Sequence, residues 1–373
     1  MKNDNDFNVA ITSLSGSKIS IFLKLTRKYG IEKRYYIRWF NSFIVSCICT
    51  IFGWFDKIVY TLKPKPKDLK DPVFIIGHWR SGTTFLHNLM CLDSNAGYTT
   101  TYQTVFPNNL FAFQWLFKPI VRLLMPDKRP VDNVKLNVDY PQEEEFALNN
   151  EYVFSYYNWW YFPKSTRAIT DEYLLAKTAQ PTEVEKFKNN YKRFVNRCLM
   201  NTKGKRFISK NPPNTSRIPW LLEMYPNAKF IFIHRNPYEV VRSTFNFYKS
   251  ILPPIQLQSV DEDELMESIL YSYTSMIEKY YIDKDLLSNK NLMEINYSDL
   301  VDAPKKIIAS VYKNLLREDF GNIEGPLMDT IKNKHSLKEY SYGKNYIDQI
   351  NSSLGWLIKK QGYQLLFPTD YKG

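Results

Sequence analysis

The chain has 373 residues, of which 44% are hydrophobic and 24% charged, a composition typical of a folded protein with one large or two small domains. Its 50 basic and 38 acidic residues give a formal charge of +12, which suits an anionic ligand, an acidic substrate or an anionic membrane surface. No zinc-finger spacing, helix-turn-helix or RNP-type strand accompanies this charge, so we expect no nucleic-acid partner.

The N-terminus does not resemble a secretory signal peptide, because residues 1–8 are polar and include two aspartates. The four cysteines form no C-x-x-C pair and no metal-ligand spacing. Four thiols in a chain of this length fit a reducing compartment. We therefore expect a cytoplasmic protein without a metal site.

Residues 18–62 form an unusual segment, in which a basic run precedes the uncharged stretch 39–55. This stretch is about the minimum length for a membrane span. Polar or small residues dilute it, namely Asn41, Ser42, Ser46, Thr50 and Gly53. Three interpretations stay open: a helix lying in the membrane interface with peripheral contact through residues 18–62, a helix packed on the protein's own core, or a true span.

A polar linker with two prolines, residues 63–68, separates this segment from an apolar strand that begins at Val73. We expect two parts in the chain. Residues 1–70 form an N-terminal helical segment, for which membrane association stays open, and residues 71–373 form a single domain.

Within the larger part, apolar strands alternate with helices. We expect short strands at 207–209, 229–234 and 292–295, and helices after Thr84 and at 172–200, 218–225, 262–281 and 303–317, with a further helix capped by Asn236. This alternation predicts an α/β fold with a central parallel sheet flanked by helices. Anion sites in such sheets lie at the carboxyl ends of the strands.

The first such end carries a loop, Gly77–Thr84, that reads Gly-His-Trp-Arg-Ser-Gly-Thr-Thr. Its glycine spacing matches the phosphate-binding P-loop, but Thr83 stands where the lysine belongs, and Arg80 supplies the cation instead. No strand that ends in a Walker-B aspartate follows. The loop therefore predicts an anion site that works without magnesium-dependent phosphoryl transfer.

A second strand end carries Arg235, and Ser243 follows eight residues later on the next helix. A guanidinium and a hydroxyl on adjoining elements suit a phosphate. Together, the two motifs predict a nucleotide with anions at both ends.

These two motifs resemble those of the sulfotransferases, in particular the branch with a Gly-x-x-Arg-Ser-Gly-Thr-Thr loop. The resemblance implies the donor 3′-phosphoadenosine 5′-phosphosulfate (PAPS). It implies that Arg235 and Ser243 bind the 3′-phosphate, and that the 5′-phosphosulfate is held by Arg80, Ser81, Gly82, Thr83 and Thr84.

Three further segments resemble elements of the same family. Lys210 corresponds to a lysine that reaches the transferring group, while residues 139–148 and 335–343 resemble an acidic element and a C-terminal element. The histidine that other branches place near this lysine is missing, since Pro212 and Asn214 occupy those positions. We therefore look for the catalytic base among residues 143–145, with Glu144 as first choice and Glu143 as second.

The sequence thus predicts an enzyme that transfers a sulfuryl group from PAPS to a small-molecule hydroxyl acceptor, with Glu144 or Glu143 as base and with Lys210 and Arg80 stabilising charge. Aromatic segments at 106–117 and 156–162 favour a sterol or lipid-like alcohol as acceptor. A carbohydrate, a phenol or a peptide tyrosine remains an alternative acceptor. A P-loop-type nucleotide kinase or a non-catalytic binding protein remains an alternative function.

Overall fold

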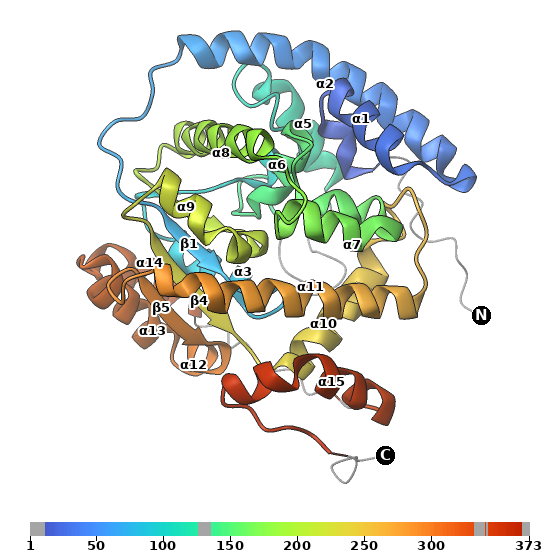
Figure 1. Cartoon of the computed structure of the whole chain (residues 1–373). Coiled ribbons are helices and arrows are strands. Elements are labelled where there is room, and N and C mark those ends of the chain that lie inside the picture. Colours follow the sequence, from blue (N-terminus) through green and yellow to red (C-terminus); the bar gives the residue numbers. More distant parts are fainter. Residues whose placement is uncertain (1–11, 126–135, 332–339, 341, 368–373) are drawn as a thin grey trace. The chain divides into compact units, whose positions relative to one another are not determined.

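The computed structural model describes residues 12–125, 136–331, 340 and 342–367, and the statements below concern these residues. Five strands form one sheet in the order β2-β3-β1-β4-β5. They are β1 (Val73–Ile76), β2 (Ala96–Gly97), β3 (Arg206–Lys210), β4 (Lys229–His234) and β5 (Leu292–Asn296). The α/β fold with a parallel sheet and flanking helices is confirmed (Figure 1).

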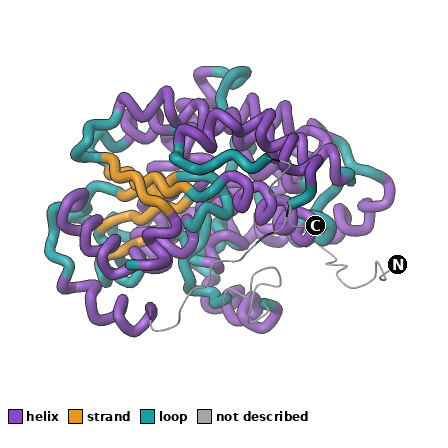
Figure 2. The backbone as a smooth tube through the Cα atoms, turned by 90° about the horizontal axis from the view of Figure 1, so that it is seen from below, coloured by secondary structure: helices purple, strands orange, loops and turns teal. Residues whose placement is uncertain are grey.

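The central strand pairs are parallel, and β1 and β4 consist mainly of buried apolar residues. All four residues of β1 are buried, and β1 pairs with β4 in the register Val73↔Lys229 to Ile76↔Phe232. β4 pairs with β5 from Phe230↔Leu292 to His234↔Asn296. Continuous apolar runs of this kind mark strands covered by helices on both sides. The strands are orange in Figure 2.

The chain forms two compact units. Unit 1 comprises residues 1–70, 97–209 and 247–262, and unit 2 comprises residues 71–96, 210–246 and 263–373. Unit 1 holds the helices α1 (Ile19–Tyr29), α2 (Tyr36–Leu62), α4 (Thr101–Val105), α5 (Gln114–Leu124), α6 (Glu144–Glu151), α7 (Thr166–Ile169) and α8 (Pro181–Thr202). The others are α3 (Thr83–Met90), α9 (Ile218–Met224), α10 (Pro237–Ile251), α11 (Glu262–Asp283), α12 (Tyr297–Asp302), α13 (Pro304–Ser310), α14 (Gly321–Ile331) and α15 (Lys344–Lys360).

Two expected helices have different limits in the structure. The helix expected at 172–200 is divided into a π-helical turn, Thr170–Leu174, and α8, which begins only at Pro181. Proline favours the first turn of a helix because its missing N–H needs no partner there. The helix expected at 303–317 changes from α13 to a π-helical segment, Val311–Leu316.

The N-terminal segment forms α1 and the long helix α2 within unit 1 (blue in Figure 1). Ser42 accepts the amide of Thr12 at 2.8 Å, and Ser46 donates to the carbonyl of Ser17 at 2.7 Å. Ser42 and Ser46, two polar residues of the apolar stretch 39–55, therefore attach α2 to the preceding segment of unit 1. Residues 33–62 are also long and apolar enough to cross a membrane, by length and composition alone.

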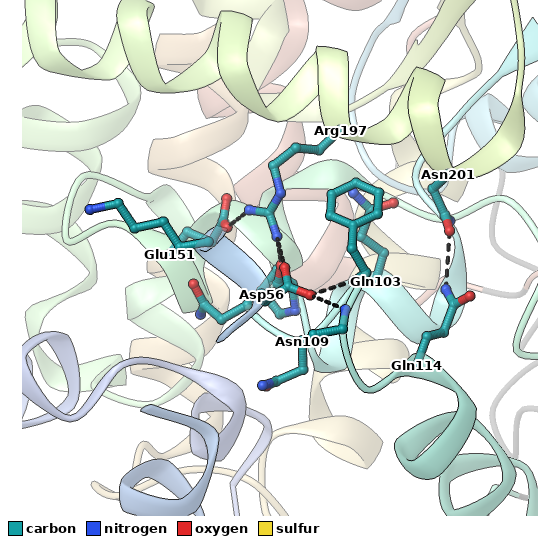
Figure 3. Close-up of polar contacts among 12 residues, drawn as sticks. Asp56, Gln103, Asn109, Gln114, Glu151, Arg197 and Asn201 are labelled. Carbon is teal, nitrogen blue, oxygen red and sulfur yellow. Dashed lines mark hydrogen bonds and ion pairs between the residues drawn. The ribbon is translucent and has the colours of Figure 1, made fainter. Parts of the chain in front are cut away.

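A buried ion-pair cluster joins α2 to α6 and α8 (Figure 3). Arg197 on α8 pairs with Glu151 and lies 3.4 Å from the carboxylate of Asp56 on α2. It also donates to the carbonyl of Pro107, while Asp56 accepts the amide of Ala112 at 2.9 Å. All three charged side chains are less than a tenth exposed. One guanidinium therefore interacts with two carboxylates that are out of contact with water.

Replacement of Arg197 should destabilise the protein strongly. In Arg197→Met both carboxylates stay buried without their cation, so we expect the free energy of unfolding to fall by about 3–5 kcal/mol. Chemical denaturation measures this loss. Lys192→Met, at an exposed position of the same helix, is the matched control and should change stability by less than about 0.5 kcal/mol. Equal stability of the two variants would contradict the role given to Arg197.

Candidate active site

The loop between β1 and α3 is built on left-handed backbone. Gly77 has φ +137°, Arg80 φ +67° and Gly82 φ +100°. Ser81 braces the turn by donating its hydroxyl to the carbonyl of His78 at 2.6 Å. Glycine adopts such angles without strain, whereas Arg80 holds a conformation that costs a non-glycine residue about 1–3 kcal/mol. The backbone bends so that the loop runs directly into the N-terminus of α3.

Gly82 is required for a second reason. A Cβ atom at this position would stand 2.2 Å from the ring of Tyr297, the first residue of α12. A Cβ at Gly77 would stand 2.3 Å from the carbonyl oxygen of Ile233. Both glycines therefore permit close approach of neighbouring segments as well as the bend.

The decisive contact joins the two motifs found in the sequence. Arg80 Nε donates to Ser243 Oγ over 3.0 Å, and the Ser243 side chain on α10 is nearly buried. The loop after β1 and the helix after β4 therefore face one common location. The parallel pairing of β1 with β4 explains this, because it brings the carboxyl ends of both strands to one edge.

Arg235 stands beside these residues through two partners. Its guanidinium pairs with Glu239 one helical turn later, with Nε 2.7 Å from the carboxylate, and lies over the ring of Tyr297 at 4.7 Å. Glu239 engages Nε and Nη2, while Nη1 has no hydrogen-bond partner among the described residues. The guanidinium is thus held in place with donor capacity remaining.

Lys210 opens the segment that braces the loop. It is the last residue of β3 and is almost fully buried. Five residues later, Thr215 accepts the amide of Gly77 at 2.8 Å. A hydrogen bond therefore connects the segment that begins at Lys210 to the first residue of the loop Gly77–Thr84.

The remaining loop residues have different surroundings. Thr83 is buried and Thr84 is half-buried in the first turn of α3. His78 stacks on Tyr273 with ring centroids 3.8 Å apart, and its burial lowers its pKa to about 3. A neutral, packed imidazole of this kind supports the loop and carries no charge at neutral pH. The described residues contain no cluster of His, Cys, Asp or Glu suited to a metal ion.

The acidic run lies in unit 1, at the start of α6, and its three members have distinct partners. Glu144 is buried and accepts the hydroxyls of Tyr191, at 2.6 Å, and Ser209. Burial raises the pKa of the Glu144 carboxyl above its ordinary value. Glu143 is partly exposed and accepts the hydroxyl of Tyr157.

Glu145 has a structural environment. Its carboxylate accepts the Ser155 hydroxyl at 2.9 Å and the Tyr156 amide at 2.8 Å, and the side chain is fully buried. It therefore fixes the segment after α6. Ser209, the partner of Glu144, immediately precedes Lys210 in the chain.

Two residues of this arrangement were not predicted from the sequence. Tyr297 contacts both the loop glycine and Arg235, and Glu239 pairs with Arg235. The spacing of Glu239 four residues after Arg235 is a helical ion-pair signal that could have been recognised. Tyr297 follows β5, a distant strand, and no local pattern marks it. Of the expected C-terminal element 335–343, residues 335–339 and 341 lie outside the described residues.

Comparison with known proteins identifies the family. The profile described as "Sulfotransferase family" matches residues 72–318, which is more than half of the chain. The chain belongs to the sulfotransferase family. It is therefore an enzyme of the sulfotransferase type, as the sequence motifs predicted.

Relatives and solved structures agree with this assignment. The chain is 31% identical over 327 residues to proteins of Mycobacterium bovis and Mycobacterium tuberculosis named omega-hydroxy-beta-dihydromenaquinone-9 sulfotransferase Stf3, covering 87% of this chain and 82% of theirs. The crystal structure of sulfotransferase STF9 from Mycobacterium avium has a TM-score of 0.68 at 14% identity, with 98% of this chain and 99% of that chain covered. Sulfotransferase STF1 from Mycobacterium tuberculosis has a TM-score of 0.61 at 17% identity, with 83% and 84% covered.

Gly82→Ala should disrupt the loop. The added methyl group must adopt a left-handed backbone and displace Tyr297, so we expect the free energy of unfolding to fall by about 2 kcal/mol or more. Gly355→Ala is the control, because Gly355 lies inside α15 and a Cβ there would meet only Leu365 at 3.8 Å. That substitution should raise stability by up to about 1 kcal/mol. Thermal and urea unfolding of both variants measure the difference.

Proposed function

We propose that this protein transfers the sulfuryl group of PAPS to the hydroxyl of a sterol or other lipid-like alcohol. The observation that supports the donor most directly is the 3.0 Å hydrogen bond from Arg80 to Ser243. It brings together the two motifs that each suit one anionic end of the donor. The 3′-phosphate and 5′-phosphosulfate are attached to one ribose, so residues that bind them must be neighbours.

The residues of the two motifs fit this donor. In our proposal the loop with Arg80, together with residues 81–84, holds the 5′-phosphosulfate through backbone amides, hydroxyls and the guanidinium. Arg235 and Ser243 hold the 3′-phosphate. Arg235 Nη1 and the Ser243 hydroxyl offer donors to that group.

The proposed reaction is a direct displacement. The acceptor oxygen attacks sulfur, the bond from sulfur to the 5′-phosphate oxygen breaks, and 3′,5′-bisphosphoadenosine leaves. Lys210 and Arg80 stabilise the negative charge that develops on the sulfuryl and leaving oxygens. The positive charge that the reaction needs thus comes from side chains, and the proposal requires no metal.

The proton of the acceptor goes to a glutamate, with Glu144 as our first choice. Its raised pKa makes it a stronger base than an ordinary carboxylate, and the hydroxyls of Tyr191 and Ser209 fix its orientation. Glu143 is the alternative base, supported by its partial exposure.

The acceptor class rests on two observations. The relatives with 31% identity are named for a hydroxylated menaquinone derivative, which is a lipid. Unit 1 also contains aromatic rings in contact. The ring centroid of Phe52 lies 4.8 Å from that of Phe113 and 5.3 Å from that of Phe117. We further propose a cytoplasmic protein with peripheral membrane contact through residues 18–62, from which a lipid acceptor is reached.

Thermal unfolding with nucleotides tests the donor. At about 100 times its dissociation constant a ligand adds about 2.7 kcal/mol, so 3′,5′-bisphosphoadenosine should raise the melting temperature by several degrees. Arg235→Ala should lose most of this shift, since it removes the guanidinium that we propose binds the 3′-phosphate. Arg317→Ala in the same unit is the matched control and should keep it. A shift with ATP and Mg²⁺ but none with bisphosphoadenosine would refute the donor.

Transfer of labelled sulfate to an apolar primary alcohol tests the base. Glu144→Gln should lower turnover by about 10²–10⁴-fold with unchanged donor affinity. In the wild type the carboxylate must be ionised, so turnover should fall as the pH drops through the raised pKa of Glu144. Turnover of Glu144→Gln should not show this fall at low pH.

Glu145→Gln, on the same helix, is the control and should retain turnover and its pH profile. If Glu143→Gln alone shows the loss, the base is Glu143. Label that enters only a sugar acceptor in a parallel reaction would contradict the lipid-like acceptor.

A further inference from the structure

Helix α2 has an inverted polarity that its sequence alone does not reveal. Its apolar residues recur every three or four positions and are exposed, between 43% and 80%: Ile37, Phe40, Ile44, Ile48, Ile51, Phe55, Ile58 and Leu62. We call these eight residues the outer stripe. They lie on one side of a helix of 27 residues, about 40 Å long at about 1.5 Å per residue.

The opposite face is polar and buried. Besides Ser42 and Ser46, Arg38 donates to the carbonyl of Pro253 at 2.9 Å and to that of Gln256 at 2.7 Å. Asp56 accepts two amides after α4 and pairs with Arg197. A soluble amphipathic helix buries its apolar face, whereas α2 buries its polar one. The outer stripe is therefore an unusually long exposed apolar surface, of the kind that marks a docking site.

The charges around the outer stripe indicate what covers it. From residue 33 to residue 67 the exposed charged residues are all basic, and the single acid, Asp56, is buried. The exposed cations are Lys33, Arg34, Lys57, Lys63, Lys65 and Lys67. Glu32 pairs with Arg34 at 3.0 Å, and the exposed Asp68 follows Lys67, so these six cations exceed the two neighbouring acids by four.

A recess beside α2 adds to this positive charge. A cavity of about 370 Å³ lies between α1, α2 and α8, and its lining includes Lys18, Lys57 and Arg193. Counting Arg197, four cations line the cavity against the two carboxylates of Asp56 and Glu151, which leaves an excess of two positive charges. An apolar stripe framed by unbalanced cations matches the interface of an anionic bilayer, where acyl chains meet negative headgroups.

We propose that α2 is an in-plane membrane anchor, whose outer stripe enters the headgroup–acyl boundary of an anionic bilayer while its axis lies parallel to the membrane. The hydrogen bonds of Arg38, Ser42, Ser46 and Asp56 keep the helix on unit 1, so it does not cross the bilayer. This refines the peripheral contact proposed above. It depends on α2 alone and not on the sulfotransfer reaction.

Vesicle flotation of the full chain, without detergent, tests this anchor. We expect binding to phosphatidylcholine vesicles that contain about 30% phosphatidylglycerol, at least tenfold weaker binding to phosphatidylcholine alone, and weakening by salt. The triple variant Ile37→Glu, Ile51→Glu, Ile58→Glu changes the most exposed isoleucines of the outer stripe and should lower the partition coefficient at least tenfold. Unchanged binding of this variant would overturn the proposal.

The matched control places three glutamates on exposed apolar residues of unit 2. Ile282→Glu, Leu286→Glu, Met328→Glu changes the net charge equally and should bind like the wild type. Circular dichroism and melting temperature establish that both variants fold.

Two other occupants would contradict the anchor. Protein that stays in the vesicles after washing at alkaline pH would show a true span. A dimer in solution that ignores vesicles, and that the outer-stripe variant converts to monomer, would show that a second copy covers the stripe. Because neither readout measures sulfate transfer, their outcomes are separate from that of the proposed reaction.

Discussion

The hydrogen bond between Arg80 and Ser243 is the contact on which the candidate donor site depends. It forms only if the loop after β1 bends left-handed at Gly77, Arg80 and Gly82 and if β1 pairs in parallel with β4. Each condition has a local cause. Glycine supplies the bends at Gly77 and Gly82, and the hydrogen bond of Ser81 to His78 braces the turn at Arg80. Thr215 fixes the amide of Gly77, and the apolar strands β1 and β4 are buried inside the sheet.

Two arginines in this protein are held in place by side-chain partners. Arg235 is held by Glu239 and Tyr297, while Arg197 holds two carboxylates in unit 1. In both cases a fixed guanidinium loses less conformational entropy on meeting an anion than a mobile one would. The two differ in burial and partners: Arg197 is buried and pairs with two carboxylates, whereas Arg235 pairs with one carboxylate and is the residue we propose for the 3′-phosphate.

The candidate donor site and the exposed apolar stripe of α2 are both consistent with the proposed transfer of a sulfuryl group to a lipid-like alcohol. The family assignment gives the reaction type, and the related Stf3 proteins are named for a lipid acceptor. In our proposal, a helix with a polar inner face and an apolar outer stripe keeps the enzyme at a membrane surface, where a lipid-like acceptor would be reached. Neither feature requires the other, so each can be tested alone.

The sequence by itself determined the α/β class, the strands at 73–76, 229–234 and 292–295 and the two anion motifs, because short apolar runs that end in Gly or Arg-Asn-Pro are local signals. It also placed Glu144 and Lys210 among the candidates, whose catalytic roles remain predictions. Only the tertiary structure decided that Arg80 contacts Ser243, that Tyr297 packs on Gly82, and that α2 turns its polar residues inward. These facts depend on strand order and on which side of a helix is covered, and both are set by contacts between residues distant in the chain, which no local pattern encodes.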